Sequence, residues 1–200
     1  MIGDFIYDLF HSLGPVFVLL TLYLIFLIDA AIFPALPEVF AVLFFLANPL
    51  PEGSALIWGL AVLCIAILGE LTGNTALYLI VRNLLVKKKK MPSFLERLMK
   101  RYMDFLIVKD EKIILVNRVA PVVPMVGAFM AVCEWSYRRS MTYIFFGSVA
   151  KYSFLLLLVG FFGVVYERGT AEIFALVAVL AIIVISGLLS VVYRRRIMNQ

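Results

Sequence analysis

Five charged side chains lie inside otherwise apolar stretches of this sequence, where they could bind an anion or exchange a proton: Asp29, Glu38, Glu70, Arg118 and Lys151. An unpaired charge in hydrocarbon costs roughly 3 kcal/mol or more, so each needs a partner, water or a function. An arginine offers a fork of donors that suits a phosphate, and a carboxylate can take up a proton. Lys151 is near the middle of its segment, and we expect it to face Glu70, Asp29 or Glu38.

One apolar segment is polar at every fourth position, which places these side chains in one stripe along a helix. The stripe consists of Glu70, Asn74, Tyr78 and Arg82. Gly69 and Gly73 lie on a neighbouring face, and a small-xxx-small pair of this kind suits close contact with another helix. Besides a transport site, the alternative interpretation of these charges is a set of structural ion pairs that fix a helix bundle.

Catalytic motifs are absent from the sequence. It contains no H-E-x-x-H, no G-x-S-x-G, no P-loop and no Cys/His cluster, and has one histidine and two cysteines in all. We therefore expect no enzymatic activity, no catalytic residue, no metal and no cofactor.

The composition is that of a membrane protein. Hydrophobic residues make up 64% of the 200 residues, charged residues 16%, and the mean hydropathy is +1.05. A soluble domain of this size cannot bury so much apolar surface, so we expect one membrane domain over residues 1–200. The net charge of +5 could suggest nucleic acid, but the basic residues are placed as in a membrane protein.

Four apolar segments are long enough to cross about 30 Å of hydrocarbon as helices, at about 12–28, 55–82, 140–163 and 171–193. Two further apolar segments contain prolines: 29–47 has Pro34 and Pro37, and 112–132 has Pro121 and Pro124. A break at Pro121 leaves arms of roughly 13–16 Å at 1.5 Å per residue, enough to reach the midplane only. The carbonyls freed by a proline need partners that lipid lacks, so such a tip must lie inside the protein or line a wet cavity.

We therefore expect two re-entrant helical hairpins that enter from opposite faces, an inverted repeat of the kind that builds a midplane site in transporters. This topology places nearly all Lys and Arg on the cytoplasmic side together with both termini, as the positive-inside rule requires. Residues 92–108, which follow the Lys87–Lys90 run, have the spacing of an amphipathic helix on the anionic inner leaflet. The predicted fold is thus an all-α integral membrane protein.

Three stretches resemble the DedA membrane proteins, whose shared core is called the VTT domain. The second hairpin of that family reads roughly R-x-x-P-G-x-R, followed by Ala-Gly and aromatic-x-x-Arg-Arg; here Arg118, Pro121 and Ala131 match, and "YRRSMTY" follows. Its second span carries G-D and then Y-x-x-G-R, and "GNTALYLIVR" (73–82) corresponds. Its first hairpin carries an acidic residue, prolines and a glutamate, and "DAAIFPALPE" (29–38) corresponds.

The sequence also departs from that pattern. Pro124 replaces the second arginine, Val122 and Val132 replace hairpin glycines, Asn74 replaces the aspartate, and Val81 replaces the glycine before the last arginine of the second span. The resemblance covers about residues 29–163 and indicates a divergent member.

The resemblance implies translocation of lipids with phosphate headgroups in the cell membrane, either polyprenyl-phosphate carriers or phospholipids, with proton coupling proposed for some members. Loss of the second arginine favours a broader phospholipid substrate. The expected transport site comprises Glu38, Arg118, Pro121, Asp29, Glu70, Asn74, Tyr78 and Lys151.

Two other functions fit some of the same features. The membrane acids Asp29, Glu38 and Glu70 would suit a proton-coupled exporter of small cations or drugs. The Gly69/Gly73 face and the basic amphipathic helix would suit a membrane assembly factor. Whether the protein forms a homo-oligomer is left open by the sequence.

The predicted topology can be tested by cysteine labelling. With Cys64 and Cys133 replaced by serine, single cysteines at Lys89 and Arg168 should be labelled from opposite faces of the membrane by an impermeant maleimide. Labelling of both positions from the same face would contradict the two-hairpin topology.

Overall fold

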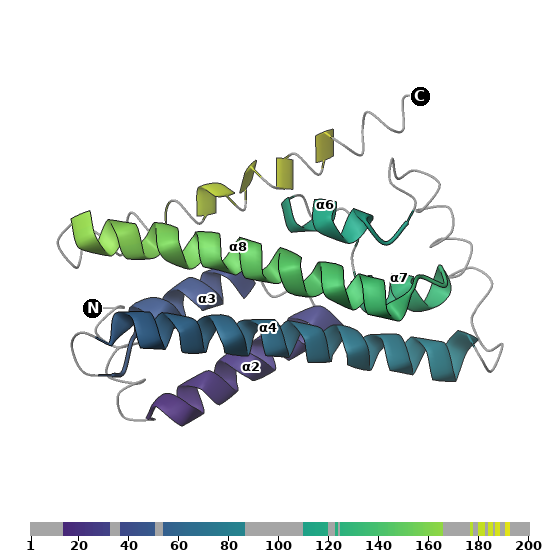
Figure 1. The fold of residues 1–200 in the computed structure, drawn as a ribbon, viewed down its shortest axis with the longest axis horizontal. Helices are drawn as coiled ribbons and strands as arrows, with labels where there is room; N and C mark the ends of the chain where they lie inside the picture. Colours follow the sequence, from purple (N-terminus) through teal and green to yellow (C-terminus); the bar gives the residue numbers. More distant parts are fainter. Residues whose placement is uncertain are drawn as a thin grey trace.

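The computed structural model of the chain describes residues 14–32, 37–50, 54–86, 110–119, 123 and 125–165, together with residues 177, 180–182, 184, 185, 187, 188, 191 and 192. All regular elements in these residues are helical, as the sequence predicts. They are α2 (Pro15–Ala31), α3 (Pro37–Leu46), α4 (Ala55–Ile80), the π-helical segment η1 (Val81–Val86), α6 (Ile113–Val119), α7 (Val126–Val132) and α8 (Tyr137–Val165). Their arrangement is shown in Figure 1.

Two long helices, α4 and α8, form the centre of the bundle and run in opposite directions (Figure 1). The stretches Ala55–Val86 and Tyr137–Phe161 are long and apolar enough to cross a membrane. They correspond to the spans predicted at 55–82 and 140–163, and both helices extend a few residues further. Many apolar side chains are exposed, including Val16 (80%), Leu56 (76%) and Leu157 (73%). This surface favours a membrane protein because apolar side chains in such number need a non-aqueous solvent.

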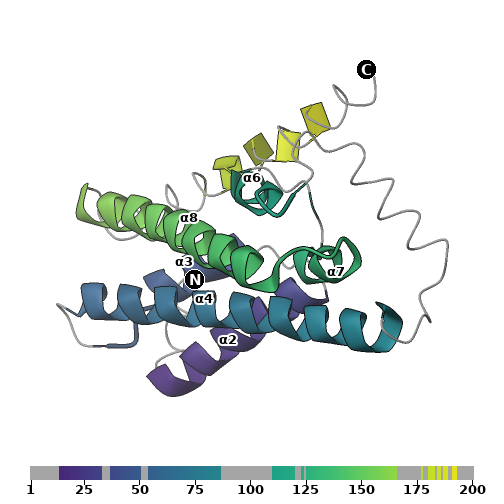
Figure 2. The same cartoon turned by 45° about the vertical axis from the view of Figure 1, so that its right-hand side comes forward.

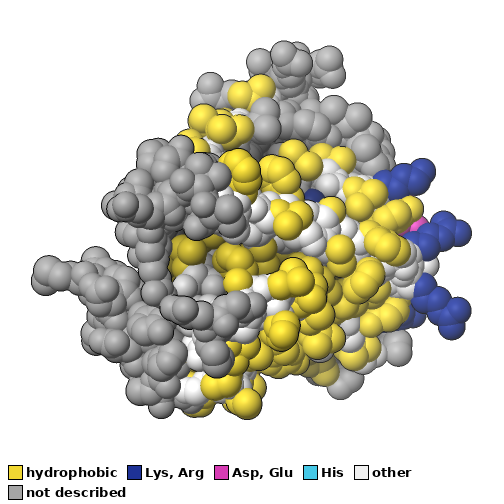
Figure 3. Space-filling model, turned by 60° about the vertical axis from the view of Figure 1, so that its left-hand side comes forward, with side chains coloured by type: hydrophobic (Ala, Val, Ile, Leu, Met, Phe, Trp, Pro, Cys, Tyr) yellow, Lys and Arg dark blue, Asp and Glu magenta, His cyan; other side chains and the backbone are white. Residues whose placement is uncertain are grey.

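The surface of the described residues separates by polarity. Figure 3 shows hydrophobic side chains over most of the coloured surface and Lys and Arg side chains gathered at one edge. The exposed side chains of Lys112 and Arg139 belong to the start of α6 and of α8. A cationic end next to an apolar surface is what the positive-inside rule predicts for the cytoplasmic side.

Helices α2 and α3 correct the predicted boundaries at the N-terminal side. The sequence predicted a span at 12–28 and a separate hairpin at 29–47, but α2 continues to Ala31 and includes Asp29. A helix of 17 residues is about 25 Å long and α3, with ten residues, about 15 Å. The helix continues because no proline occurs between Pro15, its first residue, and Pro34. Helix α3 begins at Pro37, where the missing N–H loses no hydrogen bond. Pro34 lies outside the described residues.

Helix α2 packs directly on α4 through the predicted glycine face. A Cβ at Gly69 would lie 2.7 Å from the Cβ of Phe26, and one at Gly73 would lie 2.5 Å from the carbonyl oxygen of Leu27. The order of these contacts shows that α2 and α4 run in the same direction. Helix α3 then returns, because the indole N–H of Trp58 near the start of α4 donates to the Phe44 carbonyl at 2.8 Å.

Helices α6 and α7 confirm the predicted break inside 112–132. Each has seven residues, about 10 Å of helix, and residues 120–122 and 124, which include Pro121 and Pro124, lie outside the described part. Nη1 of Arg139 lies 3.5 Å from Oε1 of Glu111, so α6 begins beside the start of α8. Helix α7 lies on α4, where a Cβ at Gly127 would be 2.4 Å from the Asn74 carbonyl oxygen.

The two pairs of short helices reach the middle of α4 from opposite ends (Figures 1 and 2). The α2–α3 break lies beside Gly73, because Ala30, near the end of α2, packs against this glycine. The α6–α7 break lies beside Asn74, because Gly127, near the start of α7, packs against the Asn74 backbone. Helices α2 and α7 are also in contact. Entry of these pairs into a membrane from opposite faces stays a prediction. The amphipathic helix predicted at 92–108 lies outside the described residues, and the span at 171–193 is described only at separate helical positions.

Each short-helix pair has its own hydrophobic core. The first core joins α2, α3, the first half of α4 and the second half of α8, with Leu22, Val42 and Trp58 fully buried. The second core joins α6, α7 and the opposite halves of the long helices, and includes Ile113 and Ile144. Three of the buried polar side chains among the described residues, Glu70, Asn74 and Ser148, come from the segments of the long helices that lie between the two cores, and the fourth, Ser140, lies in the first turn of α8.

The α2–α4 contact predicts that Gly73 tolerates no side chain. Gly73→Ala would place a Cβ against the Leu27 backbone, and such overpacking costs about 1–3 kcal/mol. The midpoint of thermal unfolding in detergent should fall. Gly187→Ala is the control, because nothing lies within 4 Å of that position and alanine is the better helix former. Equal midpoints for the two variants would show that the contact is not close.

Candidate functional site

A single carboxylate, that of Glu70, connects three helices. Its Oε1 accepts a hydrogen bond and ion pair from Nη1 of Arg118 on α6, and its Oε2 accepts from the hydroxyl of Ser148 on α8 at 2.7 Å. The side chains of Glu70 and Arg118 are only 9% and 10% exposed. Both carboxylate oxygens are therefore used inside the bundle, which is what a buried charge requires.

A second ion pair connects α3 to α8. Nζ of Lys151 donates to Oε1 of Glu38, and the two side chains are 25% and 18% exposed. The sequence offered Glu70, Asp29 and Glu38 as partners of Lys151, and Glu38 is the one that forms the ion pair. The prediction of a direct Lys151–Glu70 pair is wrong, because Glu70 binds Arg118. Arg118 occupies the place beside Glu70, and Lys151 lies three residues beyond Ser148 along α8, nearly one helical turn.

The four charges act on one another beyond these pairs. The charge of Lys151 also acts on Glu70, and the charge of Glu38 also acts on Arg118. Glu38 is the second residue of α3, and Arg118 is the last but one of α6. Each broken helix pair therefore carries a charge at its break, and a residue of opposite charge on a long helix holds it. Two acids and two bases make the cluster neutral.

Asn74, the next residue of the predicted stripe, holds α7. Its Oδ1 accepts from the backbone N–H of Gly127 at 3.1 Å, and its Nδ2 donates to the Glu70 carbonyl at 2.9 Å. The buried amide thus has partners on both sides. The structure gives Asn74 a positioning role for the second helix pair.

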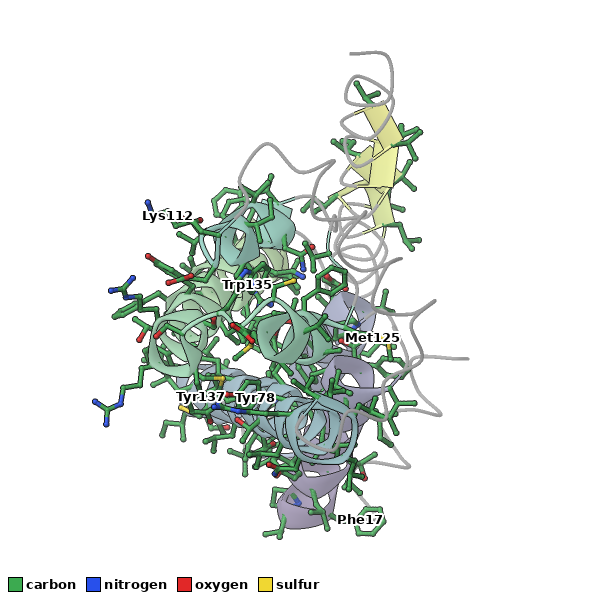
Figure 4. The ribbon with its side chains drawn as sticks, turned by 90° about the vertical axis from the view of Figure 1, so that its right-hand side faces the viewer. Phe17, Tyr78, Lys112, Met125, Trp135 and Tyr137 are labelled. Atoms are coloured by element: carbon green, nitrogen blue, oxygen red, sulfur yellow. The ribbon has the colours of Figure 1, made fainter. Side chains whose placement is uncertain are left out.

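Tyr78 and Arg82 complete the stripe toward the cationic end. A guanidinium N–H of Arg82 donates to the hydroxyl of Tyr78. The ring of Tyr78 lies 5.0 Å from the ring of Tyr137 on α8, as Figure 4 shows for these two labelled residues. The hydroxyl of Tyr137 is 3.0 Å from that of Thr75. Tyr78 is therefore part of an aromatic contact between α4 and α8, outside the charged cluster.

Asp29 and Pro121 are the remaining residues of the predicted site. Asp29 lies in the last turn of α2, and its charge acts on the buried side chain of Tyr152. Tyr152 packs edge-on against Phe26, with 5.2 Å between ring centroids. Pro121 is outside the described residues. Among the residues that the structure describes, no group of three or more His, Cys, Asp or Glu side chains could hold a metal ion.

Sequence reasoning missed Ser148 and Gly147, which lie on α8 beside Arg118 and Glu70. A Cβ at Gly147 would be 2.7 Å from Cγ of Arg118, so this glycine makes room for the arginine. Ser148 could have been noticed because it precedes the intramembrane Lys151 by three residues and so shares its helix face. Gly147 carries no comparable signal, since glycines are frequent in apolar helices.

Arg118 keeps unused donor capacity. Its Nε is buried and finds no acceptor among the described residues. A guanidinium presents five N–H donors, and a buried donor without a partner costs about 1–3 kcal/mol. The chemistry available at this site is therefore the binding of an oxyanion that can supply a further acceptor.

No protein-family model, no curated protein and no solved structure matches this chain. Its interpretation rests on its own residues and on their arrangement.

The two ion pairs predict a specific pattern of energetic coupling. Arg118→Met and Glu70→Gln should each destabilise the protein by about 3–5 kcal/mol, because each leaves a buried charge without its partner. The double variant of Arg118 and Glu70 should recover much of that loss. In the same way, Lys151→Met combined with Glu38→Gln should recover much of the loss caused by either of these substitutions alone.

Unfolding of the single and double variants in detergent measures the coupling of each pair. Lys151→Met combined with Glu70→Gln is the matched control and should show the smaller coupling, because these residues do not bond directly. A larger coupling for this control than for Arg118 with Glu70 would contradict the pairing.

Proposed function

We propose that this protein moves lipids with phosphate-bearing headgroups across the bilayer, as a flippase or scramblase of anionic phospholipids or polyprenyl-phosphate carriers. The observation that carries the proposal is the buried Arg118–Glu70–Ser148 cluster at the point where two broken helix pairs meet. It lies inside a bundle whose exposed surface is largely apolar.

The position of the cluster supports a transport site. Charged residues inside a membrane protein are expensive and mark ion or substrate pathways. Broken helices that meet near the midplane provide such sites in many secondary transporters. Arg118 and Glu38 both lie at helix breaks, so a change in either short-helix pair would move a charge.

The proposed topology completes this picture. Helices α4 and α8 and the predicted span at 171–193 cross the cell membrane, the pairs α2–α3 and α6–α7 enter from opposite faces as an inverted arrangement, and the C-terminus is cytoplasmic. In this arrangement α2 forms the first arm of the first hairpin and replaces the separate span predicted at 12–28, since it runs parallel to α4 and ends beside Gly73. The start of α2 then lies on the face where α4 begins, opposite the cytoplasmic end of α4, so the proposed topology has three spans and departs from the predicted cytoplasmic N-terminus. Headgroups would reach Arg118 from either face when one pair moves away from α4.

The rival function, export of small cations coupled to protons, is less well supported. Glu38 and Glu70 already have cationic partners in Lys151 and Arg118, so a cation would have to displace a tethered side chain from each acid. An anion would instead compete with Glu70 for an arginine that has donors to spare. Proton coupling fits lipid transport as well, because a displaced carboxylate can take up a proton.

Substitution of Arg118 tests the proposal. In liposomes with a fluorescent phospholipid, dithionite accessibility reports lipid movement, and Arg118→Ala should abolish it in a folded, monodisperse protein. Arg118→Lys should lower the rate, because lysine replaces a fixed fork of donors by a point charge.

Arg138→Ala is the matched control, since Arg138 is an exposed residue of α8, and it should transport lipid like the wild type. Wild-type rates for Arg118→Ala would show that the arginine serves the fold alone.

A further inference from the structure

The Ser148 hydroxyl lies between two acceptors. Its oxygen is 2.7 Å from Oε2 of Glu70 and 2.7 Å from the carbonyl oxygen of Ile144 in the preceding turn. A hydroxyl has one hydrogen and can donate to only one acceptor at a time. Ser148 can therefore release Glu70 and remain hydrogen-bonded, so departure of the carboxylate leaves no unsatisfied hydroxyl donor.

Among the described residues, Arg118 donates a hydrogen bond from one guanidinium nitrogen only. Nη1 donates to Glu70, while the buried Nε has no acceptor. A Cβ at Gly147 would stand 3.2 Å from this Nε and 2.7 Å from Cγ. The glycine therefore keeps the Nε edge of the guanidinium free of side-chain atoms on the α8 side.

We infer that the Glu70 carboxylate is a displaceable internal ligand, which occupies the place of a tetrahedral phosphate oxyanion on Arg118 and Ser148. This inference rests on the proposed function and names its substrate chemistry: a phosphate monoester or diester group that accepts from the adjacent Nη1 and Nη2 of Arg118 and from the Ser148 hydroxyl.

The geometry explains why a phosphate would compete. The two oxygens of Glu70 are already used, one by Nη1 of Arg118 and one by Ser148, so Glu70 binds Arg118 through a single nitrogen. A phosphate group has unesterified oxygens in a tetrahedral arrangement, and arginine binds such groups through two parallel N–H bonds. One phosphate can therefore accept from Nη1 and Nη2 of Arg118 and from the Ser148 hydroxyl, three donors against the two that Glu70 serves.

The displaced carboxylate also has a partner within reach. The charge of Lys151 already acts on Glu70, although Lys151 bonds directly to Glu38. When Arg118 binds phosphate, Glu70 turns toward Lys151 and takes up a proton from water, because the charge of Lys151 is already balanced by Glu38. Arg118 then balances one charge of the phosphate, Lys151 balances Glu38, and the protonated Glu70 leaves no uncompensated carboxylate in the low-dielectric interior.

Phosphate binding by Glu70 variants tests the exchange. We would titrate the purified full-length protein in detergent with inorganic phosphate and record the affinity from calorimetry and from the shift in thermal unfolding. Glu70→Gln removes the competing charge and should bind phosphate about 10-fold more tightly or better, the equivalent of one hydrogen bond to a charged group.

Glu70→Asp keeps the charge but shortens the side chain, and should give an intermediate affinity. It also serves if Glu70→Gln does not fold. Glu134→Gln, at an exposed position after α7, is the matched control and should bind like the wild type. An affinity that is the same in wild type, Glu70→Asp and Glu70→Gln would overturn the inference.

Ser148 and the choice of anion test the composition of the site. Adding Ser148→Ala to Glu70→Gln should weaken phosphate binding about 10-fold, whereas Ser153→Ala on the same helix should not. Acetate should bind more weakly than phosphate, because a carboxylate leaves one donor unserved; equal binding of the two anions would overturn the assignment.

Dihexanoyl phosphatidic acid should bind more tightly than inorganic phosphate if the ligand is a lipid headgroup, and equally if it is free phosphate. Lipid transport by Arg118→Ala in liposomes is read separately. The phosphate-binding experiments can therefore contradict the exchange while the transport proposal stands, and the transport experiment can contradict the transport proposal while phosphate still binds.

Discussion

A charge that is buried in an apolar bundle must be neutralised, and this requirement organises the structure. Glu70 satisfies it by binding Arg118 and Ser148, and these bonds connect α4, α6 and α8 at one point. Lys151 and Glu38 satisfy it in the same way for α3 and α8. A buried charge that loses its partner destabilises the protein far more than one that exchanges its partner for another. The helices can therefore separate only where each charge receives a new partner.

The two hydrophobic cores follow from this arrangement. Each core packs one pair of short helices against half of α4 and half of α8. Glycines at 69, 73 and 127 bring the backbones close enough for this packing. Van der Waals contact is the main attraction between helices where lipid is the solvent, so small residues at the contacts decide which faces meet. The polar residues then lie between the cores, where water or a headgroup would have to enter.

The same features connect the structure to its proposed function. Under the proposed function, the bundle closed by two ion pairs would be the resting arrangement, which a charged cargo opens. The unserved Nε of Arg118 and the two acceptors available to the Ser148 hydroxyl mean that the closed arrangement does not use every hydrogen bond available to these groups. An oxyanion with more acceptors than a carboxylate can therefore compete with Glu70 for Arg118 and Ser148.

The sequence by itself determined the helical class, the two long apolar helices, the break inside 112–132 and the five membrane charges from which the ion pairs come, because composition, periodicity and proline are local properties of the chain. It also indicated the Gly69/Gly73 contact, since small residues four apart share a helix face. Only the tertiary structure decided that α2 continues through Asp29, that Arg118 binds Glu70 while Lys151 binds Glu38, and that Gly147 and Ser148 complete the site. Ion-pair partners are chosen by how helices far apart in sequence are rotated and shifted along one another, and that depends on the packing of whole faces, which no single stretch of sequence contains.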